Sequence, residues 1–240
     1  LKKQLAAFDR DFLTEDEKLL FDALTESAES SLLFDGLELY GQPLAPTIGI
    51  QAQLPILLAE YSFHSVQDVE DYLTLLSQLD TYFKDILTFE EQKADAGLGP
   101  SDLTIDRIID SCNSYLIDPE HNFLTETFAS RLQSLETSVP LSAQQKEDFT
   151  NRHLLTIRDS FLPAYQHLIE GLAALKGRGI NDQGLAGFHY GKRYYECLVR
   201  SLGLSYHIEG LRSALTDRMN CDLETISALS KQQISLRIFF

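Results

Sequence analysis

The sequence contains few cysteines and no long apolar run, and both absences narrow the class of protein. Its three cysteines, Cys112, Cys197 and Cys221, form no Cys-x-x-Cys pair and lie among helix-periodic apolar residues, so we predict buried thiols. No stretch of about 18 apolar residues occurs, so no membrane-spanning segment is expected. Leu1-Lys2-Lys3 leads into no signal-like apolar core, which places any targeting signal outside these residues.

Basic side chains are also scarce. Lysine and arginine number 20 against 36 acidic residues, which gives a net charge of −16. A surface of this charge repels a phosphate backbone, so we expect no nucleic-acid partner. The excess of acid is concentrated in residues 1–100. A solvated acidic face explains it, with a docking surface for a basic partner as the alternative.

Apolar residues make up 44% of the chain and recur mainly every three or four positions. The strict alternation of a half-buried strand is nearly absent. The sequence therefore predicts an all-α fold, a bundle of long helices that forms a single domain over residues 1–240 or the N-terminal half of a larger two-half protein.

Start and stop signals predict the individual helices. Three pairs have the spacing of a capping box, in which each side chain satisfies a backbone donor of the first turn: Thr14 with Glu17, Ser65 with Asp68 and Ser142 with Gln145. The second box begins an unbroken rod of about thirty residues, roughly 45 Å long, that ends at Gly97. The predicted helices cover residues 15–30, about 66–96, about 102–117, about 123–132, about 142–176, 192–202 and about 211–229.

Glycine and proline mark the connections. They are expected to break any regular element from Phe34 to Pro55. For the Gly49-Ile50-Gln51 part of this long connection, simple packing against another part of the protein is the favoured explanation and a functional role is the alternative. The rod that begins after Ser142 should bend at Pro163, because proline lacks a donor and its ring clashes one turn back. A second, glycine-rich connection runs from residue 177 to 191.

No complete catalytic site is predicted. None of the six histidines is followed by glutamate, and no two stand three or four residues apart, so a helical zinc motif is absent. Nucleophile elbows and phosphate-binding glycine loops are missing too. Neighbouring carboxylates such as Glu90 and Glu91 are common on an acidic helical surface. We therefore assign no catalytic residue, no metal ligand and no cofactor to these residues.

The segment from residue 189 to 196 is the strongest candidate for ligand contact. It gathers three tyrosines, two cations and an imidazole around a glycine. At the start of a helix, backbone donors and positive charge converge and could bind a peptide carboxylate or carbonyl. Equally, Tyr194 and Tyr195 could pack in a core while the cations face water. The substrate-binding hypothesis names Tyr190, Lys192, Arg193 and Tyr195.

Three stretches, in this order and separation, resemble the bacterial family known as domain of unknown function 885 (DUF885). They are GIQAQLPILLAEYSFHSVQDVEDYLTLLSQLDTYF from Gly49, FLPAYQHLIEGL from Phe161 and GLAGFHYGKRYYECLVRSL from Gly184. The resemblance implies a helical fold similar to gluzincin-like zinc metallopeptidases, with a deep cleft between two mostly helical halves.

In this family the metal motif belongs to the later half, as a His-Glu-x-x-Pro-Gly-His segment and a glutamate in a Glu-Gly-Trp context. The latter cannot occur here, because the chain has no tryptophan. Only Gly191-x-x-Tyr194-Tyr195 and Pro163-Ala164-Tyr165 match family motifs, and neither supplies a metal ligand. The resemblance thus implies a non-catalytic N-terminal half that forms part of the substrate cleft, with zinc in the C-terminal half.

The expected partners are that C-terminal half and a peptide substrate. If the second half normally covers this one, residues 1–240 alone should expose an apolar patch, and so bind a hydrophobic dye or form a homodimer. Some relatives resemble envelope lipoproteins, which implies an extracytoplasmic location, although a cytoplasmic one stays open. The alternative function is a helical interaction or scaffold module without enzymatic activity.

Overall fold

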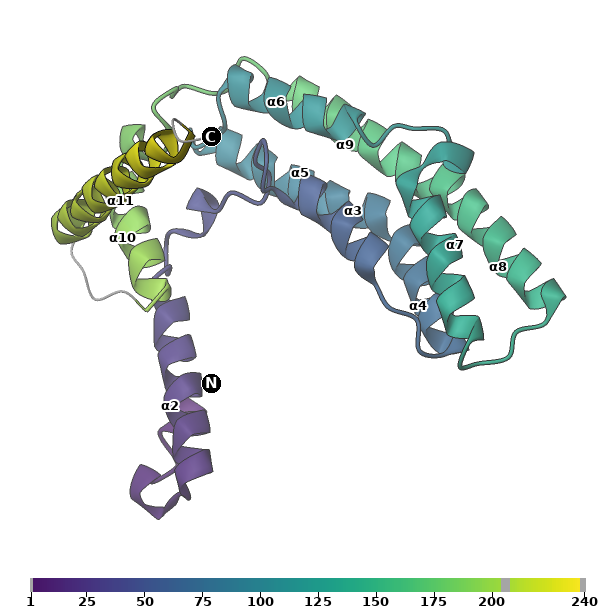
Figure 1. Cartoon of the computed structure of the whole chain (residues 1–240), viewed down its shortest axis with the longest axis horizontal. Coiled ribbons are helices and arrows are strands. Elements are labelled where there is room, and N and C mark those ends of the chain that lie inside the picture. Colours follow the sequence, from purple (N-terminus) through teal and green to yellow (C-terminus); the bar gives the residue numbers. More distant parts are fainter. Residues whose placement is uncertain (1, 204–207, 238–240) are drawn as a thin grey trace. The chain divides into compact units, whose positions relative to one another are not determined.

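The computed structural model of the chain describes residues 2–203 and 208–237, and within these ranges its regular structure is helical, with no strand (Figure 1). The predicted all-α fold class is therefore confirmed. The chain divides into two compact units. Residues 1–38 and 189–240 form one, here called the terminal unit, and residues 39–188 form the other, called the central unit.

The central unit is a bundle of helices that run along one another (Figure 1). Helix α9 packs against α5 and α6, α3 packs against α6 and α7, and α8 packs against α4 and α7. The elements of this unit are α3 (Ile50–Glu60), α4 (Val66–Ser77), α5 (Leu79–Asp95), α6 (Asp102–Asn113), η3 (Pro119–His121), α7 (Phe123–Glu136), α8 (Ala143–Thr156), the π-helix η4 (Ile157–Phe161), α9 (Leu162–Ala174) and η5 (Gly184–Gly187), with the short η2 (Glu38–Tyr40) at its beginning.

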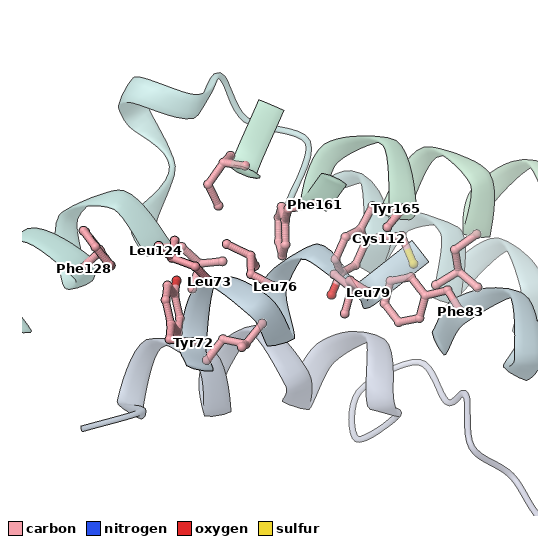
Figure 2. Packing of buried hydrophobic residues seen from close by; sticks show 14 of the residues in the cluster. Tyr72, Leu73, Leu76, Leu79, Phe83, Cys112, Leu124, Phe128, Phe161 and Tyr165 are labelled. Atoms are coloured by element: carbon pink, nitrogen blue, oxygen red, sulfur yellow. The ribbon is translucent and has the colours of Figure 1, made fainter. Parts of the chain in front are cut away.

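The core of this unit is rich in aromatic rings (Figure 2). Phe83 of α5 meets Tyr165 of α9 edge to face, with 5.0 Å between the ring centroids, and Phe161 lies 4.8 Å from the same tyrosine. All three side chains are almost fully buried. Since burying one such side chain contributes about 1.5–3 kcal/mol, the aromatic core is a main source of stability.

Pro55 lies inside α3, so the prediction that it ends the preceding connection is wrong. A proline within a helix leaves the carbonyl four residues earlier without its usual donor, which here is the carbonyl of Gln51. The hydroxyl of Tyr165 donates to that oxygen at 2.7 Å. Because a distant side chain supplies the missing hydrogen bond, the helix continues through the proline.

The segment before α3 is explained by packing. A Cβ atom on Gly49 would lie 2.2 Å from the backbone nitrogen of Ala45, so only glycine fits there. The buried Gln51 side chain donates from Nε2 to the Ala45 carbonyl at 2.5 Å. These contacts hold the loop against the first turn of α3, as the packing explanation expects.

The two long rods of the prediction are each interrupted. The first is divided at Gln78, where φ is −88° and ψ is −1°, so α4 and α5 are separate helices. The second is interrupted by the π-helix η4, and Pro163 follows in the first turn of α9. The carbonyl with which the ring of Pro163 would clash belongs to Asp159, inside η4. The interruption therefore lies before the predicted position.

The capping boxes are confirmed. Thr14, Ser65 and Ser142 each accept a hydrogen bond from the backbone of the third helical residue, and that residue's side chain accepts one in return. These three residues precede α2 (Glu15–Leu32), α4 and α8. Each box satisfies otherwise unpaired donors of the first turn, which explains why the predicted starts are accurate.

The terminal unit is more open. It contains α1 (Lys2–Leu5), η1 (Arg10–Phe12), α2, α10 (Gly191–Ser201) and α11 (Ile208–Arg237), and α2 buries none of its residues. Helix α10 packs against the end of α2 through Phe34 and Tyr194, whose ring centroids lie 5.5 Å apart. Cys197 donates from Sγ to the Leu33 carbonyl at 3.2 Å.

Two of the three cysteines are buried as predicted, namely Cys112 and Cys197. The prediction is wrong for Cys221, which is exposed because, by the helical period, it lies on the side of α11 away from Leu215 and Met219. Among the residues that the structure describes, no helix is both long enough and apolar enough to cross a bilayer.

Candidate functional site

The four residues of the substrate-binding hypothesis all lie at the beginning of α10 and are exposed. The side chains of Tyr190 and Tyr195 are 48% and 44% exposed. Lys192 and Arg193 also face solvent, whereas Tyr194 is half-buried against Phe34. Core packing therefore explains Tyr194 and does not explain Tyr195. The exposed set forms a surface of mixed phenolic and cationic character.

The first turn of α10 has the electrostatics of a weak anion site. Its N-cap, Tyr190, makes no side-chain capping hydrogen bond, and the first backbone N–H groups of a helix favour an anionic acceptor. Lys192 lies 3.9 Å from Glu196 and 3.7 Å from Glu209, long surface contacts that contribute little and are easily exchanged. A ligand carboxylate or carbonyl could compete for this lysine.

Helix α11 exposes an apolar stripe next to this surface in the terminal unit. Tyr195 lines a shallow depression together with six residues of α11, namely Ile208, Leu211, Arg212, Leu215, Thr216 and Met219. From this depression to Leu229, apolar side chains three or four positions apart are 56–59% exposed. We call this set the α11 stripe; its members are Leu215, Met219, Leu223, Ile226 and Leu229. An exposed face of this length is typical of a surface that another polypeptide covers.

A cavity in the central unit was not predicted from the sequence. It has a volume of about 320 Å³ and is lined by α5, α6, α9, the segment around Leu44 and the glycine-rich connection. Two charged side chains of α5 lie in its wall, Glu90 at 1% exposure and Lys93 at 5%. Burial raises the pKa of Glu90, and the neighbouring ammonium of Lys93 opposes that rise.

The spacing of residues along α5 contains a signal for this pair. Residues Phe83, Ile86, Glu90 and Lys93 are spaced by three and four positions, so the two charges continue the buried stripe of α5. The prediction that Glu90 is one of many surface carboxylates is wrong, because its side chain is buried. Its neighbour Glu91 is exposed, so that description fits Glu91 alone.

In the part of the chain that the structure describes, neither the beginning of α10 nor the cavity of the central unit contains a set of metal ligands. Within residues 2–203 and 208–237, no three histidine, cysteine or carboxylate side chains converge to hold an ion. The described residues therefore do not fit a zinc ion, and we derive no catalytic step from them.

Comparison with known proteins places these features in context. The family described as "Bacterial protein of unknown function (DUF885)" matches residues 1–206. No match was found among curated proteins. A crystal structure from Colwellia psychrerythraea, described as a "putative lipoprotein", is similar in fold, with a TM-score of 0.61 and 18% sequence identity. The similarity covers 67% of this chain and 27% of that one.

Proposed function

The chain belongs to the DUF885 family of bacterial proteins, and on this basis we propose that it forms the non-catalytic N-terminal helical part of a zinc-dependent peptidase. In this proposal zinc and the water that attacks the peptide bond belong to the C-terminal half. The part described here contributes one wall of the substrate cleft. Two things support it: the family's resemblance to helical metallopeptidases, and the much greater length of the similar crystallised chain.

The α11 stripe is the observation that carries the proposal. Five apolar side chains, each more than half exposed, occupy one face of a helix in the terminal unit. Covering such a side chain is worth about 1.5–3 kcal/mol, so a partner surface would gain several kcal/mol from this stripe. We propose the C-terminal half of the same polypeptide as that partner.

The role proposed for α10 is to orient a peptide. Lys192 and Arg193 would bind a carboxylate or carbonyl of the substrate beside the uncapped first turn, with Tyr190 and Tyr195 as the neighbouring phenols. In the intact longer protein, alanine at Lys192 and Arg193 should raise KM for a peptide at least several-fold. Alanine at Arg200, exposed at the other end of the same helix, is the matched control.

Unchanged kinetics in the Lys192→Ala and Arg193→Ala variants would remove α10 from the cleft. The alternative function, an interaction module without enzymatic activity, predicts no zinc-dependent turnover by the longer protein at all. Metal analysis and a peptidase assay of that protein distinguish the two.

A dye experiment on residues 1–240 tests the α11 stripe directly. The isolated chain should bind a hydrophobic dye or form a homodimer, and Met219→Glu with Leu223→Glu should abolish either property. Ser213→Glu, an exposed position on the opposite side of α11 by the helical period, is the control. A monomer without dye binding contradicts the proposal.

The location of the protein is also a proposal. The similar crystallised chain is described as a lipoprotein, and we propose an extracytoplasmic or cell-envelope location for this chain as well. Fractionation of cells that produce the longer protein tests it, and recovery in the cytoplasmic fraction would contradict it.

A further inference from the structure

The cavity of the central unit is lined by several packed segments of the chain and has no role in the function proposed above. Glu90 and Lys93 of α5 line it, and Leu44, Ile108 and Leu172 supply apolar surface from three separate segments of the chain. At about 320 Å³ it lies at the small end of the range for small-molecule sites. This is room for roughly ten water molecules, far more than one buried polar group needs.

The glycine-rich connection is held firmly as the outer wall. A Cβ on Gly179 would lie 2.3 Å from the Pro100 carbonyl oxygen, so the two backbones are in close contact. The backbone of Gly177 donates to Asp102 at 2.8 Å, and Arg178 forms an ion pair with Asp95. These contacts fix the beginning of the wall to α5 and α6.

The other end of the wall closes on the segment before α3. Phe188 meets Tyr40 edge to face, with 6.4 Å between the ring centroids, and both residues line the cavity. The space is therefore enclosed by parts of one unit that are far apart in sequence.

The ion pair in the wall has unused hydrogen-bonding capacity. Lys93 Nζ donates to Glu90 Oε1 at 3.0 Å and lies 3.0 Å from Oε2, but Oε2 is buried with no hydrogen-bond partner. An ammonium group carries three donors and a carboxylate several acceptor sites. A buried charged group costs free energy for each position left unsatisfied, unless a ligand or water fills it.

Charge balance selects the chemical class of ligand. Glu90 and Lys93 neutralise each other, so a ligand with a single net charge would leave one charge uncompensated in a buried site. Asp182 at the rim is exposed, and solvent screens it. A zwitterion keeps the site neutral and can use both partners.

We propose that this cavity binds a small zwitterionic molecule with an apolar side chain. Its ammonium group donates to Glu90 Oε2, its carboxylate accepts from Lys93, and its side chain packs against Leu44, Ile108 and Leu172. An apolar α-amino acid has this chemistry and fits the volume. The binding is independent of any peptidase activity of the longer protein.

Calorimetric titration of the full chain with L-leucine tests the proposal. Saturable binding is expected with L-leucine, and at least tenfold weaker binding with N-acetyl-L-leucine, which lacks the ammonium, and with L-leucinamide, which lacks the carboxylate. No saturable binding of L-leucine overturns the proposal and leaves a water-filled cavity. Equal binding of the three probes also overturns it, because recognition would then be apolar only.

Variants test the residues. The pair replacement Glu90→Leu with Lys93→Met removes both charges together, which avoids leaving one buried charge alone, and should abolish L-leucine binding. Glu91→Gln is the matched control and should bind as the wild type does, since Glu91 is exposed on the same helix. Retained binding in a folded pair variant overturns the assignment. If the variant with both replacements does not fold, the comparison of the three probes on the wild-type chain still tests the proposal.

Discussion

The hydrogen bond from Tyr165 to α3 leads to a sharp prediction about stability. Pro55 deprives the Gln51 carbonyl of its helical donor, and the Tyr165 hydroxyl replaces it at 2.7 Å. Both Gln51 and Tyr165 are fully buried, so no solvent molecule competes for the bond. Burial also raises the pKa of Tyr165, which keeps the hydroxyl protonated as a donor.

The substitution Tyr165→Phe removes only the hydroxyl. The ring keeps its contacts with Phe83 and Phe161, whose centroids lie 5.0 and 4.8 Å away. The Gln51 carbonyl then has no donor, and leaving a buried acceptor unsatisfied costs about 1–3 kcal/mol. We expect the free energy of unfolding to fall by that amount, measured by urea denaturation with far-UV circular dichroism.

A second substitution isolates the cause. Alanine at position 55 restores the backbone N–H that donates to Gln51, so Tyr165→Phe should cost less than about 1 kcal/mol in a Pro55→Ala background. The double-mutant cycle should give a coupling of about 1–2 kcal/mol between the two positions. Tyr115→Phe is the control, because Tyr115 donates at 3.2 Å to Ala52, and Ile56 retains its N–H for that carbonyl.

The result that refutes this reasoning is simple. If Tyr165→Phe costs the same with proline and with alanine at position 55, the hydroxyl does not substitute for the missing helical bond. The continuation of α3 through Pro55 would then need another explanation.

Two further predictions concern the core around Tyr72. His153 is buried against Phe128, and desolvation, with a smaller effect of Arg131, lowers its pKa to about 3 from an ordinary 6.5. As the pH falls, the imidazole of His153 is protonated first in the unfolded chain, because its pKa there is the ordinary 6.5. The contribution of this residue to the free energy of unfolding is therefore complete above pH 6.5 and is lost as the pH falls towards 3. Between pH 7 and 5 the loss is about 2 kcal/mol. In urea titrations, the His153→Phe variant should not show this loss, whereas the control variant His121→Phe, changed at an exposed histidine, should show it as the wild type does. Equal pH dependence in the wild type and both variants contradicts the assignment. Arg131 donates to the Leu58 and Tyr61 carbonyls at 2.9 Å each. The substitution Arg131→Met should therefore lower the free energy of unfolding by about 3 kcal/mol. A loss under about 1 kcal/mol in the same titrations would show that these hydrogen bonds are dispensable.

The sequence alone determined the fold class and the positions of most helix starts. At Thr14, Ser65 and Ser142 the capping hydrogen bonds join residues three positions apart, so the spacing of residue types is sufficient information. The buried stripes of α4 and α6 follow in the same way from a period of 3.6 residues. Family membership was recognised from three ordered stretches, of which the third contains the candidate residues of α10.

Only the tertiary structure decided what depends on distant contacts. Pro55 was expected to break a helix, and it does not because a hydroxyl 114 residues away from Gln51 supplies the missing bond. The sequence predicts a surface charge at Glu90, but Glu90 and Lys93 line a cavity together with residues of α6, α9 and the glycine-rich connection. Helix α11 has the periodicity of a packed helix, yet its stripe is exposed. A periodic pattern states which face of a helix is apolar, and only the packing of other elements determines whether that face is covered.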